Sequence, residues 1–151
     1  MTEAPRAVGR FVKSVRVPFS ACDPAGIMFF AQYHIMFQNL VDDWVTERLG
    51  ISYAELLGPR RVGLPTVRLE TDFRAPTRMG DGIRLELSVE HLGRTSLVLG
   101  FVVRGDVAAA TDTVRVQARQ VIVCTHLDHH TSMPFPDDLR AAIEGFRGEV
   151  A

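Results

Sequence analysis

The feature that most constrains the fold is one helical segment that is apolar on several sides, followed by segments that alternate with a period of two. Between Phe29 and Leu49, apolar residues recur at spacings of three and four, and others fill the remaining faces. Such a helix is normally buried. Beyond residue 64 the period changes to two, which is typical of strands. One buried helix ahead of four strands predicts an α+β fold with the helix against one sheet face.

The expected elements follow the turn residues of the chain. Gly50 is expected to end the long helix, and the capping-box pattern Ser52 to Glu55 predicts a short helix that ends near Gly58. Strands are expected at 11–19, 64–73, 83–89, 95–103 and about 109–125, with a closing helix at 137–146. The chain is expected to form a single domain over residues 1–151, with a flexible lead at 1–10 and a C-terminal extension at 134–151.

Composition excludes several classes of function. The net charge of −1 gives no electrostatic reason to expect nucleic acid or an acidic membrane as a partner. No apolar run approaches the length of a membrane span, and the N-terminus lacks the apolar stretch of a signal peptide. Cys22 and Cys124 form no disulfide or metal pattern, which fits a reduced, cytoplasmic location.

The candidate site lies in the segment from Ala21 to Ala31. Pro24 favours an extended Asp23, and Gly26 permits backbone angles and close approaches that a side chain would block. The amides from Ile27 to Phe30 come at the expected helix start, where the helix dipole favours developing negative charge. Asp23 can therefore serve acyl transfer as a nucleophile or a general base, with amides near Phe30 meeting the oxyanion. The structural alternative is an ordinary Asx-turn or N-cap aspartate.

The run from Asp23 to Ile27, followed by an aromatic pair and a helix with Tyr33 and His34, resembles the 4-hydroxybenzoyl-CoA thioesterase family of hot-dog proteins. The likeness extends from about Val15 to near His126 and is most specific between Asp23 and Tyr33. The resemblance implies a hot-dog fold, in which a curved antiparallel sheet wraps around a long central helix, with subunits paired as a dimer or a dimer-of-dimers tetramer. It also implies hydrolysis of an acyl-CoA substrate without a metal or another cofactor.

The resemblance assigns roles to two further positions. In the family, the backbone amide at the position of Phe30 binds the oxyanion. Gln38 matches a position where hydroxybenzoyl-type members carry an acid that binds the phenolic hydroxyl of the substrate. Glutamine can hydrogen-bond that group but brings no charge, so unsubstituted aryl and aliphatic acyl groups stay open. The alternative for Gln38 is a position in a subunit interface.

Other residues have both a functional and a structural interpretation. Tyr33 and His34 lie in the aromatic-rich segment from Phe29 to Phe37, which favours an aryl substrate but is equally typical of a core. His34 is a candidate base, although a histidine in an apolar helix is more often packed and hydrogen-bonded. Cys22 has no evident partner base and is expected to be a small buried residue.

Two clusters lie farther along the chain. The turn with Arg94, Thr95 and Ser96 offers a cation and hydrogen-bond donors for a CoA phosphate or pantetheine, or is simply solvated. His126, His129 and His130 with Asp128 resemble a metal cluster, but their spacing matches no helical or hairpin metal pattern. A solvated loop and no metal site are expected there.

The sequence predicts an acyl-CoA thioesterase that acts on an aryl-CoA of the benzoyl or 4-hydroxybenzoyl type. The alternatives are an acyl-carrier-protein thioesterase, an aliphatic acyl-CoA thioesterase and a non-catalytic acyl-CoA-binding module. Asp23 and Gly26 argue against the binding module, which needs no carboxylate that faces a thioester. A hydratase would pair an Asp or Asn with a nearby His, whereas Met28 stands five residues after Asp23.

Overall fold

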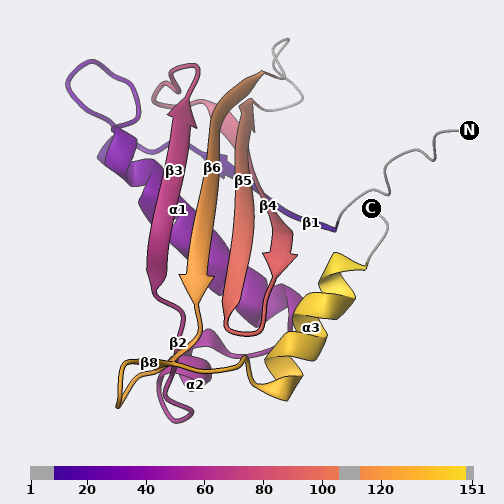
Figure 1. The fold of residues 1–151 in the computed structure, drawn as a ribbon. Helices are drawn as coiled ribbons and strands as arrows, with labels where there is room; N and C mark the ends of the chain where they lie inside the picture. The colour runs from indigo at the N-terminus through magenta and orange to yellow at the C-terminus, as the bar shows by residue number, and fades with distance from the viewer. Residues whose placement is uncertain (1–8, 106–112, 149–151) are drawn as a thin grey trace, which may run out of the picture.

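A computed structural model describes residues 9–105 and 113–148 of the 151-residue chain. One helix lies across an antiparallel sheet of five strands, which confirms the expected α+β hot-dog architecture (Figure 1). In spatial order the strands are β1 (Arg10–Arg16), β4 (Gly82–Leu92), β5 (Ser96–Gly105), β6 (Val114–Val123) and β3 (Thr66–Phe73). Because neighbouring strands are antiparallel, the end of β1, the start of β4 and the end of β3 share one end of the sheet.

The long helix covers one face of this sheet. α1 spans Phe30–Asp43 and continues into a π-helical turn over Trp44–Arg48, where the Leu49 amide donates to Trp44 O at 2.9 Å. The wider turn, which the sequence did not predict, accompanies the burial of both Trp44 and Val45. Gly50 then ends the helix with a φ of +73°, as expected of a glycine at this position.

The core lies between α1 and the inner face of the sheet. Alternate residues of the three central strands are buried there: Ile83, Leu85, Leu87, Val89, Leu97, Leu99, Phe101, Val103, Val116, Ala118 and Ile122. The rings of Phe37 on α1 and Phe101 on β5 stack with centroids 4.6 Å apart. The period-two pattern of the sequence therefore marks the face that packs on the helix.

The far end of the sheet carries smaller elements. α2 (Tyr53–Leu57) begins at Ser52, whose Oγ accepts from the Glu55 amide at 3.2 Å, as the capping-box pattern predicts. β2 (Val62–Gly63), β7 (Thr125–His126) and β8 (Thr131–Ser132) form a small three-stranded sheet that is too short for a periodic signal. α3 (Asp137–Arg147) buries Leu139, Ile143 and Phe146 against the core, so the C-terminal segment is part of the packed structure.

The element boundaries agree with the sequence within a few residues. β1 begins at Arg10, while residues 1–8 of the expected flexible lead lie outside the described residues. The expected start of the last long strand near residue 109 and the turn at Asp106 also lie outside them, and Thr125 belongs to the separate strand β7. Among the described residues, no helix has the length and apolar character needed to cross a membrane.

Candidate active site

The turn that carries Asp23 is held by its own backbone. The Asp23 amide donates to Ile27 O at 2.9 Å, and the Gly26 amide donates to Asp23 O at 2.9 Å. Gly26 has a φ of +77°, a left-handed conformation that glycine adopts without strain. The Asp23 Oδ1 atom accepts from the Ala25 amide at 2.9 Å, so the aspartate does form the local turn bond of the structural alternative. That bond occupies one carboxylate oxygen and leaves the other without a partner among the described residues.

A second segment fixes this turn from the side. The Met28 amide donates to Thr77 O at 2.8 Å, and the Met79 amide donates to Gly26 O at 3.1 Å. Arg115 holds the second segment in turn, because its Nη1 atom donates to Asp81 Oδ2 at 2.9 Å. The guanidinium is mostly buried, with 12% of the side chain exposed. Residues 77–81 therefore position the backbone of the Asp23 turn, and Arg115 on β6 holds residues 77–81 in place.

The same hydrogen bonds leave the Phe30 amide free at the helix start. The amides of Met28 and Phe29 are used, because Phe29 donates to Ala21 O at 3.0 Å. Phe30 is the first residue of α1, and its amide donates to no acceptor among the described residues. It lies at the positive end of the helix dipole. The structure thus brings a carboxylate and an unpaired amide to the same short segment, as the sequence predicts.

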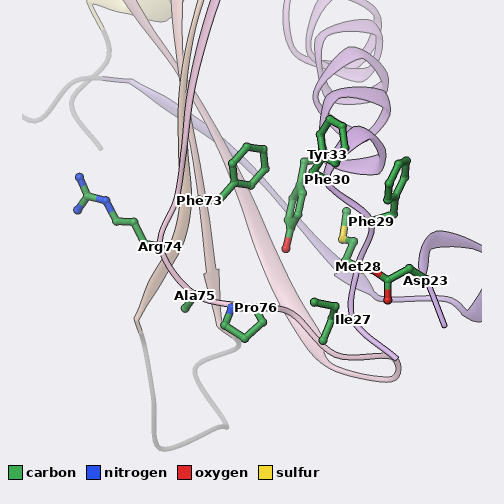
Figure 2. A pocket seen from close by; sticks show the side chains of 10 residues that line it. All are labelled: Asp23, Ile27, Met28, Phe29, Phe30, Tyr33, Phe73, Arg74, Ala75 and Pro76. Atoms are coloured by element: carbon green, nitrogen blue, oxygen red, sulfur yellow. The ribbon is translucent and has the colours of Figure 1, made fainter. Parts of the chain in front are cut away.

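Asp23 and Phe30 line a pocket of about 460 Å³. Its remaining wall is mostly apolar: Ile27, Met28, Phe29, Tyr33, Phe73, Arg74, Ala75 and Pro76 (Figure 2). The Phe30 and Phe73 rings lie edge to face with centroids 6.3 Å apart, which joins α1 to the end of β3. An apolar pocket with few polar groups is typical of a small-molecule site.

The structure separates the expected substrate-binding residues of α1. Tyr33 lines the Asp23 pocket and is 3% exposed, and this burial raises the pKa of its hydroxyl. His34 lies outside that pocket, with its Nε2 atom 3.0 Å from Thr71 Oγ1 and its ring against Phe73. His34 and Gln38 instead line a smaller pocket farther along the helix, where Gln38 Nε2 donates to the Tyr53 hydroxyl at 3.3 Å.

The expected CoA-binding turn lies elsewhere. Arg94 and Thr95 connect β4 to β5, and Ser96 begins β5, so all three lie at the end of the sheet opposite Phe73. Within one chain they do not approach the Asp23 pocket. Arg74 does line that pocket, and Figure 2 shows its side chain on the side away from Asp23. Arg74 directly follows β3, so its place in the pocket depends on where that strand ends.

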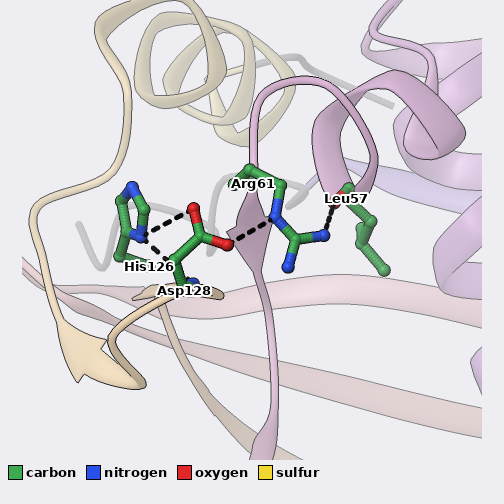
Figure 3. A network of polar contacts seen from close by, with 4 residues as sticks. All are labelled: Leu57, Arg61, His126 and Asp128. Carbon is green, nitrogen blue, oxygen red and sulfur yellow. Dashed lines mark hydrogen bonds and ion pairs between the residues drawn. The ribbon is translucent and has the colours of Figure 1, made fainter.

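The histidine-containing turn has a partner that the sequence did not indicate. Asp128 Oδ1 accepts from Arg61 Nε at 2.9 Å, and the Asp128 amide donates to His126 Nδ1 at 3.2 Å (Figure 3). The rings of His126 and His129 stack with centroids 4.8 Å apart. These contacts connect the turn to the residue that precedes β2, so the cluster has a structural use at the far end of the sheet.

The sequence of the chain is similar to those of known proteins. A family model described as the thioesterase-like superfamily matches residues 17–143. The 1,4-dihydroxy-2-naphthoyl-CoA hydrolase of Prochlorococcus marinus (strain MIT 9303) is 28% identical over 127 residues, which cover 78% of this chain and 80% of that protein.

Solved structures agree with these matches. A thioesterase-superfamily protein from Jannaschia sp. CCS1 superposes with a TM-score of 0.81 at 30% identity, covering 95% of this chain and 96% of that chain. A gentisyl-coenzyme A thioesterase has a TM-score of 0.77 at 25% identity, with coverages of 88% and 99%. The chain therefore belongs to the thioesterase-like superfamily and is an enzyme of the thioester hydrolase class.

Proposed function

We propose that the protein hydrolyses aryl-CoA thioesters to the free acid and CoA, with Asp23 as nucleophile or general base. The observation that carries this proposal is the placement of the Asp23 carboxylate and the unpaired Phe30 amide in one apolar, aromatic-rich pocket. The relatives named as hydrolases of 1,4-dihydroxy-2-naphthoyl-CoA and gentisyl-CoA support an aryl acyl group. The sequence resemblance to 4-hydroxybenzoyl-CoA thioesterases points to the same class.

The geometry accommodates two chemical routes. In the first, a carboxylate oxygen of Asp23 attacks the thioester carbonyl, the C–S bond breaks, CoA leaves as thiolate, and water then hydrolyses the mixed anhydride. In the second, Asp23 takes a proton from a water molecule that attacks the carbonyl directly. Both routes place negative charge on the carbonyl oxygen, where the Phe30 amide and the start of α1 stabilise it. Neither needs a metal or a cofactor beyond the CoA of the substrate.

The two sides of the pocket suit the two ends of the substrate. Arg74 is an exposed cation at the rim, and its guanidinium has no partner among the described residues, so we assign it to a phosphate of CoA. The aromatic wall around Phe30 and Phe73 receives the acyl group. Gln38 remains the proposed contact for a substituent of that group. The turn with Arg94, Thr95 and Ser96 lies at the opposite end of the sheet within one chain. It can therefore contact CoA only if another subunit brings it to the pocket.

We further propose that two copies pair through β3. This strand is at the edge of the sheet, and its apolar side chains are exposed, with Val67 at 60% and Phe73 at 49%. An exposed edge strand needs protection against uncontrolled pairing, and pairing with a second subunit is one solution. Sedimentation velocity tests the pairing: Val67→Asp should yield monomers, and wild-type protein that sediments as a monomer would contradict it.

The decisive experiment for the activity is steady-state thiol release from a panel of acyl-CoAs, run beside Asp23→Asn. The panel contains benzoyl, 4-hydroxybenzoyl, 2-naphthoyl, short aliphatic and long aliphatic thioesters. We expect Asp23-dependent hydrolysis of the aryl members, unchanged by EDTA. Preference for an aliphatic member would move the assignment to an aliphatic thioesterase. A folded protein that hydrolyses no member would favour a carrier-protein substrate or a binding module.

A second substitution tests the acyl end of the pocket. Gln38→Asp introduces a charged acceptor, which a phenolic hydroxyl binds more strongly than the glutamine amide. The ratio of kcat/KM for 6-hydroxy-2-naphthoyl-CoA over 2-naphthoyl-CoA should therefore rise, because a two-ring acyl group is long enough to reach the pocket that Gln38 lines. An unchanged ratio would remove Gln38 from the acyl pocket.

A further inference from the structure

We propose that Gln120 selects acyl groups that carry a hydroxyl at the end remote from the thioester. Gln120 belongs to β6, and neither the sequence pattern nor the resemblance singles it out. The inference rests on the proposed function, because it requires an aryl-CoA whose carbonyl lies at Asp23.

Gln120 is a polar residue in an apolar face. It lies on the inner face of β6 between the buried residues Ala118 and Ile122, and its cross-strand neighbours are Leu69 and Leu99. The residue is 7% exposed. Its Nε2 atom donates to Thr66 Oγ1, whereas Oε1 has no hydrogen-bond donor among the described residues. A buried acceptor without a donor destabilises the fold, so such a group calls for an explanation, and a bound ligand supplies one.

Gln120 forms part of the wall of a separate small pocket. The pocket has a volume of about 160 Å³, and its other lining residues are His34, Phe37, Gln38, Thr66 and Leu69. An apolar cavity of roughly 150 Å³ is known to hold a benzene ring. The pocket is therefore large enough for one aromatic ring, and Gln120 is one of the residues that line it.

The two pockets lie along the same seam between α1 and β3. Phe30, His34 and Gln38 follow one another at intervals of four residues on α1, so they share one side of the helix. On β3, the inner-face residues Phe73 and Leu69 belong to the Asp23 pocket and the small pocket respectively. Eight helical residues span about 12 Å. An acyl group that starts at Asp23 and reaches the small pocket is thus longer than one ring, which favours a two-ring aryl group.

The amide of Gln120 determines which chemical group is preferred at the end of the acyl group remote from the thioester. With Nε2 bonded to Thr66, the free atom Oε1 accepts a hydrogen bond. With the amide reversed, the Thr66 hydroxyl would donate to Oε1 and Nε2 would be the free group. A hydroxyl on the substrate satisfies either arrangement, because it both donates and accepts. A plain aryl ring satisfies neither and leaves the buried amide unpaired.

The test compares 6-hydroxy-2-naphthoyl-CoA with 2-naphthoyl-CoA in wild type, Gln120→Met and Gln117→Met. Methionine keeps the length of glutamine without strong hydrogen bonds. Gln117 lies on the opposite face of the same strand and is the matched control. We expect wild type to prefer the hydroxylated substrate in kcat/KM. Gln120→Met should lower that preference roughly fivefold to tenfold, and Gln117→Met should leave it unchanged.

The outcomes separate this inference from the proposed function. Wild type that shows no preference for the hydroxyl overturns the inference, whether or not the Gln120 variant folds. An unchanged ratio in a folded Gln120→Met protein also overturns it, and so does Asp23-dependent hydrolysis of benzoyl-CoA without hydrolysis of either naphthoyl thioester. In these cases the aryl-CoA activity still stands. If the folded wild-type protein hydrolyses no aryl-CoA, the proposed function itself fails.

Discussion

Two aspartates lie in tight turns at opposite ends of the sheet, and their surroundings differ. Asp23 is half-buried in a pocket and accepts one backbone hydrogen bond, with no ion pair among the described residues. Asp128 is exposed and paired with Arg61, and this hydrogen bond lowers the pKa of its carboxyl. From the turn sequences, Asp23 is a candidate for chemistry, whereas Asp128 resembles part of a metal cluster but is expected in a solvated loop. The comparison shows that the partner and the pocket distinguish a carboxylate available to a substrate from one that stabilises a loop.

The largest effect should appear when the aspartate of each turn is replaced by asparagine and the two variants are compared. Asp23→Asn keeps the turn bond to Ala25 but removes the charge, so kcat should fall by about 10²-fold to 10⁴-fold while Tm stays unchanged. Asp128→Asn removes a similar charge from the other turn and should leave turnover unchanged. Thiol-release kinetics of both variants measure the contrast. Retention of more than half of the wild-type rate by Asp23→Asn would remove Asp23 from the mechanism.

The next largest effect concerns the two arginines that pair with aspartates at the two ends of the sheet. Arg115 is mostly buried against Asp81, whereas Arg61 is largely exposed beside Asp128. Arg115→Met removes the charged partner of Asp81 and, among the described residues, leaves only the Arg78 amide bonded to that carboxylate, so we expect a loss of about 1–3 kcal/mol in the free energy of unfolding and a lower kcat. Arg61→Met should change neither quantity measurably. Chemical denaturation and kinetics on both variants test this, and equal losses would contradict it.

A smaller effect should appear in acid. The Arg78 amide, followed by the Arg115 guanidinium, holds the pKa of Asp81 below its ordinary value. A carboxyl with a depressed folded pKa adds stability above its unfolded pKa, near 4, and loses it as the pH falls through the folded value. Asp81→Asn should therefore flatten the acid limb of stability measured between about pH 5 and 2. An unaltered acid limb would show that Asp81 is not linked to folding.

The smallest effect is expected at the cysteines. Burial raises the pKa of the Cys124 thiol to about 11, so it should resist alkylation by iodoacetamide at pH 8 in the native protein. Cys22, beside Asp23, is half-buried and lies at the active-site end. Mass spectrometry of native and unfolded samples tests the difference. Fast native labelling of Cys124 would mean that the core opens near β7.

Local signals account for what the sequence predicted well. The Asp23 turn, its glycine and the start of α1 lie within ten residues, so backbone preferences and helix-end chemistry were enough to place them together. The strands of the main sheet were also recognisable, because one buried face imposes a period of two. The long helix is apolar on several sides, and this pattern predicted that it lies at the centre of the fold.

Contacts between distant strands account for what the sequence could not give. Arg115 and Asp81 meet through the pairing of strands, and Gln120 reaches the small pocket through the register of β6 with β3. The turn with Arg94 lies far from Asp23 for the same reason, because its place depends on strand direction. β2, β7 and β8 are two residues each, which is too short for any periodic pattern.

The end of α1 gives the protein a built-in optical probe. Trp44 is the single tryptophan of the chain, it is 1% exposed, and its ring meets Phe146 of α3 edge to face with centroids 5.4 Å apart. Its emission therefore reports whether α3 is docked and is insensitive to events in the Asp23 pocket, which it does not line. A red shift of that emission would identify variants in which the C-terminal helix has detached, separately from those that have lost only activity.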